Sequence, residues 1–252
     1  MATYVSAARY RAISAFTASQ RTRAEALTDL AVNAAIFELL GGLSRAGLAT
    51  GRFGLTGLPF SCVLPDGATM AVSVQNENGK VDLNAAQPDL IAALVKGVMP
   101  GDRNASALVR SLLRGREAEK GDAAGPTFVS ALELEQVPGI DHRLFLALAP
   151  MVTVHSGSPG LNARLAPAAL LAAVSGSVGP AEAERRSSAF FLAGVPGRTV
   201  LIAGAAATPS GIGFSRAAIV EFTVGPPPSY RIREWREGLT VVEPSAKGWP
   251  AC

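Results

Sequence analysis

The first forty residues constrain the fold of this chain more than any other stretch. Met1 to Leu40 contain neither proline nor glycine, are rich in the strong helix former alanine, and run into the pair Gly41-Gly42. Apolar residues recur three, four, seven or eight positions apart, a spacing that stacks them on one helix face: Ile13, Phe16, Ala24, Leu27, Ala31 and Ala34. The pattern predicts one helix over residues 2–40, roughly 55–60 Å long. A helix broken near Thr17–Thr22 is the alternative, because helix formers thin out there.

A helix of this length is longer than one small domain can cover. We expect its C-terminal half to pack against a sheet through Leu27, Leu30, Ala31, Ala34 and Leu40. We expect its N-terminal half to stay uncovered. Exposed apolar positions on a projecting helix mark an interaction surface. The residues expected to form a partner interface are therefore Tyr4, Val5, Ala8 and Ile13.

Composition permits one large domain or two small ones in 252 residues, of which 48% are hydrophobic. The formal net charge is only +3, and the basic residues are too scattered for a nucleic-acid-binding arm. No stretch reaches the ~18–20 apolar residues that a membrane span needs. We interpret Cys62 as a small core residue, and a disulfide between Cys62 and Cys252 would need an oxidising compartment.

Strand patterns lie on both sides of a helical block. Pro59–Leu64 and Thr69–Gln75 flank the turn Pro65-Asp66-Gly67 and predict an antiparallel hairpin, followed by a third strand at Lys80–Leu83. Strand patterns resume at 151–155, 199–203, 214–224 and 230–235. The order predicts an α+β fold in which residues 1–84 and 151–252 form the long helix and an antiparallel sheet. Residues 85–150 are predicted to form an inserted helical domain, with a core of Leu90, Leu94, Leu108, Leu112, Leu132 and Leu144.

An internal echo links two strand-to-helix turns. Leu83-Asn84-Ala85 leads to Pro88, and Leu161-Asn162-Ala163 leads to Pro167; a Leu- and Ala-rich segment follows each proline. We interpret both as one structural device, in which the Asn side chain caps the turn and the Pro begins a helix. An echo produced by chance in a chain rich in Ala and Leu is the alternative. The device indicates architecture and gives no evidence of chemistry.

The segment Val137-Pro138-Gly139-Ile140 resembles the turn of a helix-hairpin-helix. In DNA-binding versions of that motif the backbone amides of the hairpin hold a phosphate. Here Asp141 follows the hairpin directly, and Glu133 and Glu135 add negative charge nearby. We therefore interpret Pro138 and Gly139 as a structural helix corner, and keep a helix-hairpin-helix nucleic-acid-binding module as the alternative function.

Catalytic chemistry has little support in this sequence. The two histidines, His142 and His155, belong to no recognisable nucleophile, phosphate-binding or dinucleotide-binding motif. We expect no enzyme activity and no catalytic residues. The acidic residues of a type that could bind calcium are Asp66, Glu77, Asp82 and Asp141, but no EF-hand spacing links them.

The sequence from Val74 to Ala85, VQNENGKVDLNA, resembles a signature of minor pseudopilin K of type II secretion systems (the GspK family), in which a variant of DE-x-G-K-I-N-L-N precedes a helical insertion. Asn76-Glu77, Gly79-Lys80 and Leu83-Asn84 match; Asn76 replaces the usual Asp and Asp82 the usual first Asn. Leu161-Asn162-Ala163 with Pro167 is similar to the second signature of the family, N-V-N-T-A-P, without its first Asn and its Thr. Ser187-Ser188-Ala189-Phe190-Phe191 and the strands that end in Tyr230–Trp235 also fit the closing sheet of the family, so the matches, taken in order, cover most of the chain.

The resemblance implies a pilin-like fold with a large inserted helical domain and a non-enzymatic role at the tip of the secretion pseudopilus. It implies assembly with minor pseudopilins I and J, allows contact with secreted substrates, and implies no nucleic-acid partner. It also implies a periplasmic domain held in the inner membrane by an N-terminal anchor helix that is absent from this chain. Calcium is the one cofactor that the resemblance suggests, without ligand positions that can be carried over.

Overall fold

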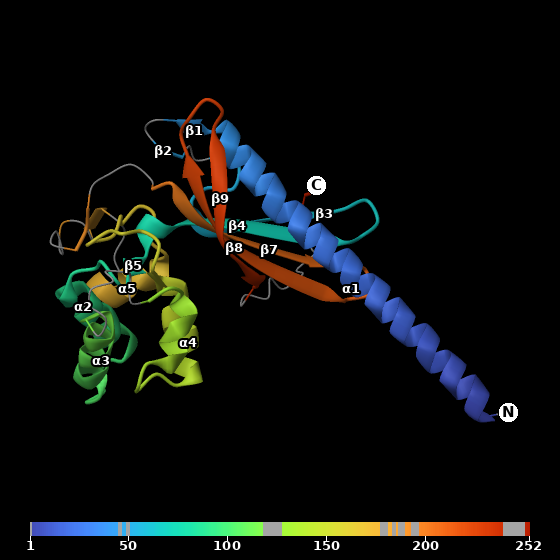
Figure 1. Ribbon diagram of the computed structural model, residues 1–252, viewed down its shortest axis with the longest axis horizontal. Helices are drawn as coiled ribbons and strands as arrows, with labels where there is room; N and C mark the ends of the chain where they lie inside the picture. Colours follow the sequence, from blue (N-terminus) through green and yellow to red (C-terminus); the bar gives the residue numbers. More distant parts are fainter. Residues whose placement is uncertain are drawn as a thin grey trace. The chain divides into compact units, whose positions relative to one another are not determined.

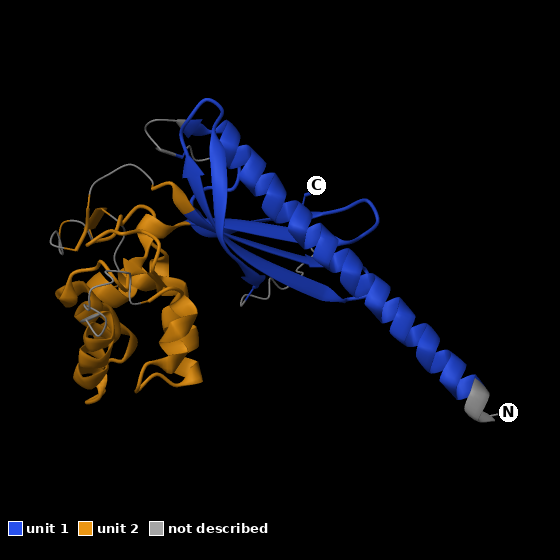
Figure 2. Cartoon of the chain, viewed as in Figure 1, with its two compact units in different colours: residues 1–75, 200–252 blue, residues 76–199 orange. Residues whose placement is uncertain are grey.

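The computed structural model describes residues 2–44, 47–48, 51–117, 128–176, 181–182, 185, 190–192, 197–238 and 250–252. The chain divides into two compact units, residues 1–75 with 200–252 and residues 76–199 (Figure 2). The second unit is larger than the insertion predicted at 85–150, because it also includes residues 76–84 and 151–199. The turns at Leu83 and Leu161 contribute to one hydrophobic core, which explains why both flanks belong to it.

Unit 1 is built on α1 (Ala2–Gly41), a single helix of 40 residues. The prediction of one helix is confirmed, and the alternative break at Thr17–Thr22 is wrong. Thr22 remains helical, with its hydroxyl donating to the carbonyl of Ala18 at 3.1 Å. In Figure 1, α1 runs as one rod across the sheet of this unit and continues past it toward the N-terminus.

The sheet of unit 1 has five strands in the order β3-β4-β7-β8-β9. The strands are β3 (Thr56–Val63), β4 (Thr69–Asn76), β7 (Thr199–Ala207), β8 (Gly213–Thr223) and β9 (Ser229–Glu237). The predicted β3–β4 hairpin is present, and Asp66 Oδ1 accepts a hydrogen bond from the amide of Ala68 in its turn. A small pair, β1 (Leu43–Ser44) and β2 (Gly47–Leu48), follows α1. The chain therefore leaves this sheet after β4 and returns to it at β7.

The face of α1 that packs on the sheet differs from the predicted one. Leu30 is 54% exposed and Ala34 is also exposed, while Leu27 and Leu40 are only half-buried. The buried side of this half is Ala24, Thr28, Ala31, Val32, Ala35, Ile36 and Leu39. Close approach explains the choice of small residues: a Cβ atom added to Gly204 of β7 would lie 2.9 Å from Val32 Cγ2 and 3.1 Å from the carbonyl oxygen of Thr28.

Polar contacts also hold α1 on the sheet. Arg216 of β8, with 11% of its side chain exposed, lies 2.9 Å from Glu25 Oε1 and 3.0 Å from Asp29 Oδ1. Its guanidinium also lies over the rings of Phe214 and Trp235. A mostly buried arginine needs such partners, because an unpaired charge is costly to bury. Arg216 therefore holds the middle of α1, around Glu25 and Asp29, against the sheet.

Unit 2 is mostly helical and contains η1 (Glu77–Gly79), α2 (Pro88–Val98), α3 (Ala105–Glu117), η2 (Ala131–Gln136), α4 (His142–Leu148), η3 (Ala149–Met151) and α5 (Ala168–Ser175). A two-residue parallel pair joins β5 (Val81–Asp82) to β6 (Val152–Thr153). Leu90, Leu94, Leu108 and Leu112 are buried in its core as predicted. Leu132 is 36% exposed and Leu134 is buried instead, and Leu144 is only partly buried. No strand of the five-stranded sheet lies among described residues 85–117 and 128–150.

Helices α2 and α5 cross at Gly97, and this contact gives a first test of the packing. A Cβ atom at Gly97 would lie 2.0 Å from the carbonyl oxygen of Ala173 and 2.7 Å from its Cα. Gly97→Ala should therefore lower the free energy of unfolding by roughly 3 kcal/mol, because backbone cannot move aside as a side chain can. Urea denaturation followed by circular dichroism measures the change.

Gly41→Ala is the matched control, since a Cβ atom at Gly41 meets nothing within 4 Å. Its effect should stay within about 1 kcal/mol, the scale of helix propensity. The higher helix propensity of alanine would, by itself, make Gly97→Ala stabilising. A Gly97→Ala protein at least as stable as the wild type would show that α2 and α5 do not approach this closely.

Candidate functional site

The segment from Asn76 to Asp82, which holds most of the first signature, is buried although it is polar. Asn76, Glu77, Lys80 and Asp82 are each 3% exposed or less. Lys80 Nζ lies 2.8 Å from Glu77 Oε1, so the two buried charges neutralise each other. Asn76 caps η1 by accepting a hydrogen bond from the amide of Asn78, and it donates to the carbonyl of Gly197 at 2.7 Å. These side chains fix the backbone where unit 2 begins.

Asp82 is the centre of the densest polar contacts in this region. Its Oδ1 accepts hydrogen bonds from the amides of Asn84 and Ala85, at 2.9 and 3.0 Å. Its Oδ2 accepts from the amide and hydroxyl of Ser156, both at 3.0 Å, and from the amide of Gly157 at 2.8 Å. One carboxylate thus joins the turn after β5 to the loop after β6. The sequence alone marks Asp82 only as a departure from the signature and as a calcium candidate.

The two echoed turns share a plan but differ in which residue caps them. Asn162 acts as predicted: its Oδ1 accepts from the amide of Arg164 at 3.0 Å. In the first copy Asp82 caps the turn, and the prediction for Asn84 is wrong. The Asn84 side chain instead makes two hydrogen bonds with the backbone of Phe128, of 2.8 and 3.1 Å. The different role follows from Asp82, two positions earlier, because Asp82 already supplies the turn with an acceptor.

Both prolines of the echo lie at helix starts. Pro88 is the first residue of α2, as predicted, and Pro167 directly precedes α5. Helices α2 and α5 contact each other in the core of unit 2. The two echoed turns therefore precede two helices that pack together. Nothing in this arrangement presents a reactive group.

The corner at Pro138 and Gly139 is structural. Gly139 has a φ of 98°, and the amide of Ile140 donates to the carbonyl of Val137 at 3.1 Å. Asp141 caps α4 by accepting from the amide of Leu144 at 2.7 Å. Its carboxylate therefore occupies the helix N-terminus at which a phosphate would bind. The nucleic-acid-binding alternative is not favoured.

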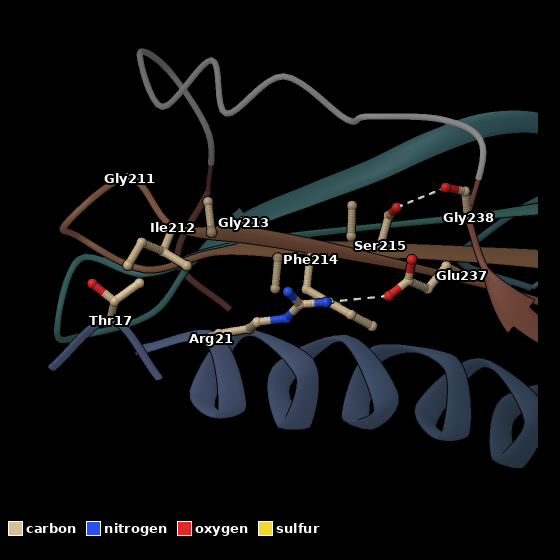
Figure 3. Close-up of a pocket in the computed structure, with 12 residues that line it drawn as sticks. Thr17, Arg21, Gly211, Ile212, Gly213, Phe214, Ser215, Glu237 and Gly238 are labelled. Carbon is tan, nitrogen blue, oxygen red and sulfur yellow. Dashed lines mark hydrogen bonds and ion pairs between the residues drawn. The ribbon is translucent and has the colours of Figure 1, made fainter. Parts of the chain in front are cut away.

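A groove of about 610 Å³ lies in unit 1 between α1 and the β7–β8 hairpin (Figure 3). Thr17 and Arg21 of α1 form one wall, residues 211–215 form the opposite wall, and the end of β9 closes it. Arg21 Nη2 reaches Glu237 Oε1 across the groove at 3.4 Å. Both of those side chains are about two-thirds exposed, and the rest of the lining is small or apolar. Among the described residues that line the groove, no nucleophile has an adjacent base.

The predicted partner interface lies on the part of α1 that the sheet does not cover. Residues 5–19 are exposed all along the helix, with Val5 at 51% and Ile13 at 65%. Ala8 is exposed as well. Tyr4 belongs to the helix, but its side chain lies outside the described part of the structure. The first turns of α1 therefore present apolar side chains that unit 1 does not bury.

The remaining candidates do not converge on a reaction or a metal. His142 Nδ1 lies 3.3 Å from Glu135 on the surface, and the amide of His155 binds the hydroxyl of Thr153. The carboxylates of the four calcium candidates each have other partners. Asp66 forms an ion pair with Arg23, and Glu77 forms one with Lys80. Asp82 accepts hydrogen bonds from two loops, and Asp141 caps α4. Within the described ranges, no three His, Cys, Asp or Glu residues gather as metal ligands would. The acidic residues therefore do not fit a calcium site there.

The cysteines form a disulfide, Cys62–Cys252, which corrects the interpretation of Cys62 as a simple core residue. Cys62 is buried, and it lies on β3 at the edge of the sheet. The end of the chain pairs with that edge: the amide of Val63 donates to the carbonyl of Pro250, and the amide of Cys252 to the carbonyl of Val63. Residues 250–252 are therefore held against β3.

In the part of the chain that the structure describes, no helix combines the length and the apolar character needed to cross a membrane. No family model matches the sequence, and no curated protein matches it. The structure is similar to a chain in the crystal structure of the GspK-GspI-GspJ complex from the type 2 secretion system of enterotoxigenic Escherichia coli, with a TM-score of 0.56. The match has 14% sequence identity and covers 91% of this chain and 100% of that one. The predicted pilin-like fold, a long helix on an antiparallel sheet with further helices, is confirmed.

Proposed function

We propose that this chain is a non-enzymatic minor pseudopilin of a type II secretion system. The observation that supports this most is the fold match over 91% of the chain, which includes both the sheet unit and the helical unit. The two signature segments lie in structurally defined turns of unit 2, at Asp82 and Asn162. The described residues, in turn, bring together no catalytic constellation.

The proposed place of action is the tip of the pseudopilus in the periplasm, in assembly with minor pseudopilins I and J. The solved complex contains GspI and GspJ beside GspK, which supports partners of that type. The Cys62–Cys252 disulfide is in keeping with an oxidising compartment such as the periplasm. An N-terminal anchor helix would hold the full-length protein in the inner membrane.

Genetic complementation tests the proposal. Deletion of the gene should block export of the secreted proteins and leave them in the periplasm, and expression of the full-length protein should restore export. Normal export without the gene would refute the proposed role, provided that no second copy replaces it.

The exposed N-terminal half of α1 gives a sharper prediction. Val5→Asp and Ile13→Asp should leave the melting temperature of the isolated chain nearly unchanged, because both side chains already contact water. The same changes should weaken co-purification with minor pseudopilins I and J at least tenfold, since they place a charge in an apolar contact.

Val32→Asp is the contrasting control, because Val32 is fully buried on the same helix. It should lower the melting temperature strongly. If Val5→Asp or Ile13→Asp lowered it to a similar extent, these residues would be part of a core, and their role in assembly would have to be abandoned.

A further inference from the structure

The two edges of the five-stranded sheet differ in how they are covered. At β3, the amide of Val63 donates to the carbonyl of Pro250, the carbonyl of Val63 accepts from the amide of Cys252, and the disulfide holds this end in place. Pro59 also removes one backbone donor from β3, as proline commonly does in edge strands. At β9, among the residues that the structure describes, no strand or isolated bridge pairs with the side away from β8. The sheet therefore has one capped edge and one uncapped edge.

The uncapped edge is regular over the first part of β9. From Ser229 to Ile232 each residue of β9 lies opposite one residue of β8, and Arg233 is then left without an opposite residue at a register shift. A bulge of this kind bends an edge strand and interrupts pairing beyond it. The regular part presents backbone N–H and C=O groups at the spacing of another strand. We call residues Ser229–Ile232 the open edge.

Apolar side chains of the open edge lie on one face of the sheet. Tyr230 and Ile232 lie opposite Phe222 and Val220 of β8, on the same face as Arg216, which contacts α1. Tyr230 is 43% exposed and Ile232 is 41% exposed. A strand added beside β9 would cover both side chains with its own side chains on this face.

Arg231 lies on the opposite face, because side chains alternate along a strand. Its direct neighbour across the strand pair is Glu221 of β8, but the Glu221 carboxylate pairs with Arg233 at 2.6 Å. Arg231 is exposed, and no carboxylate of the described residues forms an ion pair with it. A carboxylate on an added strand would supply the cross-strand partner that Glu221 does not.

A second copy of the chain fits this edge poorly. An antiparallel pair of open edges centred on Arg231 places that arginine opposite itself, and a pair centred on Ile232 places Arg231 opposite Arg233. Like charges directly opposite each other destabilise a strand pair. The charge of the open edge therefore disfavours self-pairing and favours a strand that carries carboxylates.

We propose that the open edge accepts an extended segment of another protein as an added strand of the sheet. The segment carries an aspartate or glutamate beside Arg231 and apolar residues beside Tyr230 and Ile232. Backbone hydrogen bonds supply the affinity, and the alternating side chains supply the selectivity. The site uses no residue of α1, and it does not depend on the proposed function.

A nuclear magnetic resonance titration of the isotope-labelled chain tests the inference. The probe is a short synthetic peptide, capped at both ends, in which valine and glutamate alternate. It should shift the amide signals of Ser229–Ile232 and slow hydrogen exchange at those β9 amides that point away from β8. The same peptide N-methylated at every residue cannot donate backbone hydrogen bonds, and it should bind at least tenfold more weakly.

A charge exchange tests the role of Arg231. Arg231→Glu should weaken binding of the acidic peptide about fivefold or more, and a peptide with lysines in place of the glutamates should bind this variant better than it binds the wild type. Arg231→Gln places no carboxylate beside Glu221, and it should remove the preference for the acidic peptide even if Arg231→Glu folds poorly. Arg103→Glu is the matched control, since Arg103 is exposed in the loop between α2 and α3; it should leave binding within about twofold.

Several results would overturn the inference. No change of the β9 signals at the highest soluble peptide concentration would show that the edge is closed, and equal binding of the N-methylated peptide would show that strand pairing is not used. Equal binding of the acidic and lysine peptides by the wild type would exclude an acidic partner. A dimer of the wild type in analytical ultracentrifugation that Arg231→Glu changes would assign the edge to a second copy. The complementation experiment tests the pseudopilin role independently of all these results.

Discussion

Asp82→Ala is expected to lower the free energy of unfolding by roughly 3–5 kcal/mol, a large part of the total stability of an ordinary domain. The carboxylate is 1% exposed and accepts five hydrogen bonds, three of them from Ser156 and Gly157. Removal of the side chain leaves these buried donors without an acceptor and separates the loop after β6 from the turn after β5. Urea denaturation followed by far-ultraviolet circular dichroism measures the loss.

Two further variants make this test specific. Asp82→Asn keeps one acceptor oxygen but turns an amide group toward donors, so it should destabilise the protein by a smaller amount. Asp89→Ala removes an exposed carboxylate from the first turn of α2 and should cost no more than about 1 kcal/mol. Hydrogen exchange should accelerate at the amides of Ser156 and Gly157 in Asp82→Ala. Equal stability of Asp82→Ala and Asp89→Ala would show that Asp82 does not join the two segments.

Reduction of the Cys62–Cys252 disulfide is expected to cost roughly 2–5 kcal/mol, because the bond closes a loop across a sequence separation of 190 residues. The cross-link restricts the unfolded chain, so its loss favours unfolding even if the folded contacts persist. The denaturation midpoint in urea should fall when dithiothreitol is added.

The double variant Cys62→Ala with Cys252→Ala supplies the control. Its midpoint should match that of the reduced wild type and should not respond to dithiothreitol. The amide of Val63, which donates to Pro250 at 2.9 Å, should exchange faster in this variant because the end of the chain is no longer tied to β3. An unchanged midpoint after complete reduction would contradict the stabilising role of the disulfide.

The long helix could be predicted from sequence because its signal is local. Forty residues without a break, rich in alanine, exclude other structures, and the turn at Asp66 likewise defined the β3–β4 hairpin. The orientation of the helix could not be predicted in the same way. Hydrophobicity favoured Leu30, but close contact at Gly204 favours alanine and threonine, and that contact depends on a strand more than 160 residues away.

The limits of unit 2 were missed for a similar reason. Residues 151–199 contain strand patterns, and local patterns do not tell which sheet a strand joins. β6 pairs with β5 instead of the five-stranded sheet. The parallel pairing, the hydrogen bonds of Asp82 to Ser156 and the core contacts of α5 all arise from residues far apart in sequence.

The candidate site was predictable in its outline. Pro88 begins α2 and Asn162 caps its turn, as predicted. Asp82 could have been suspected as a turn-capping residue, since an acidic residue after a strand often accepts from amides two or three positions on. Its bonds to Ser156 and Gly157 had no local signal.

The most direct test of the account is light scattering after size-exclusion chromatography of the chain mixed with minor pseudopilins I and J. We expect one species that contains all three proteins in equimolar amounts, with a mass equal to the sum of the three. Elution of this chain alone, at its own mass of 25.9 kDa, at concentrations where I and J associate with each other, would contradict the account.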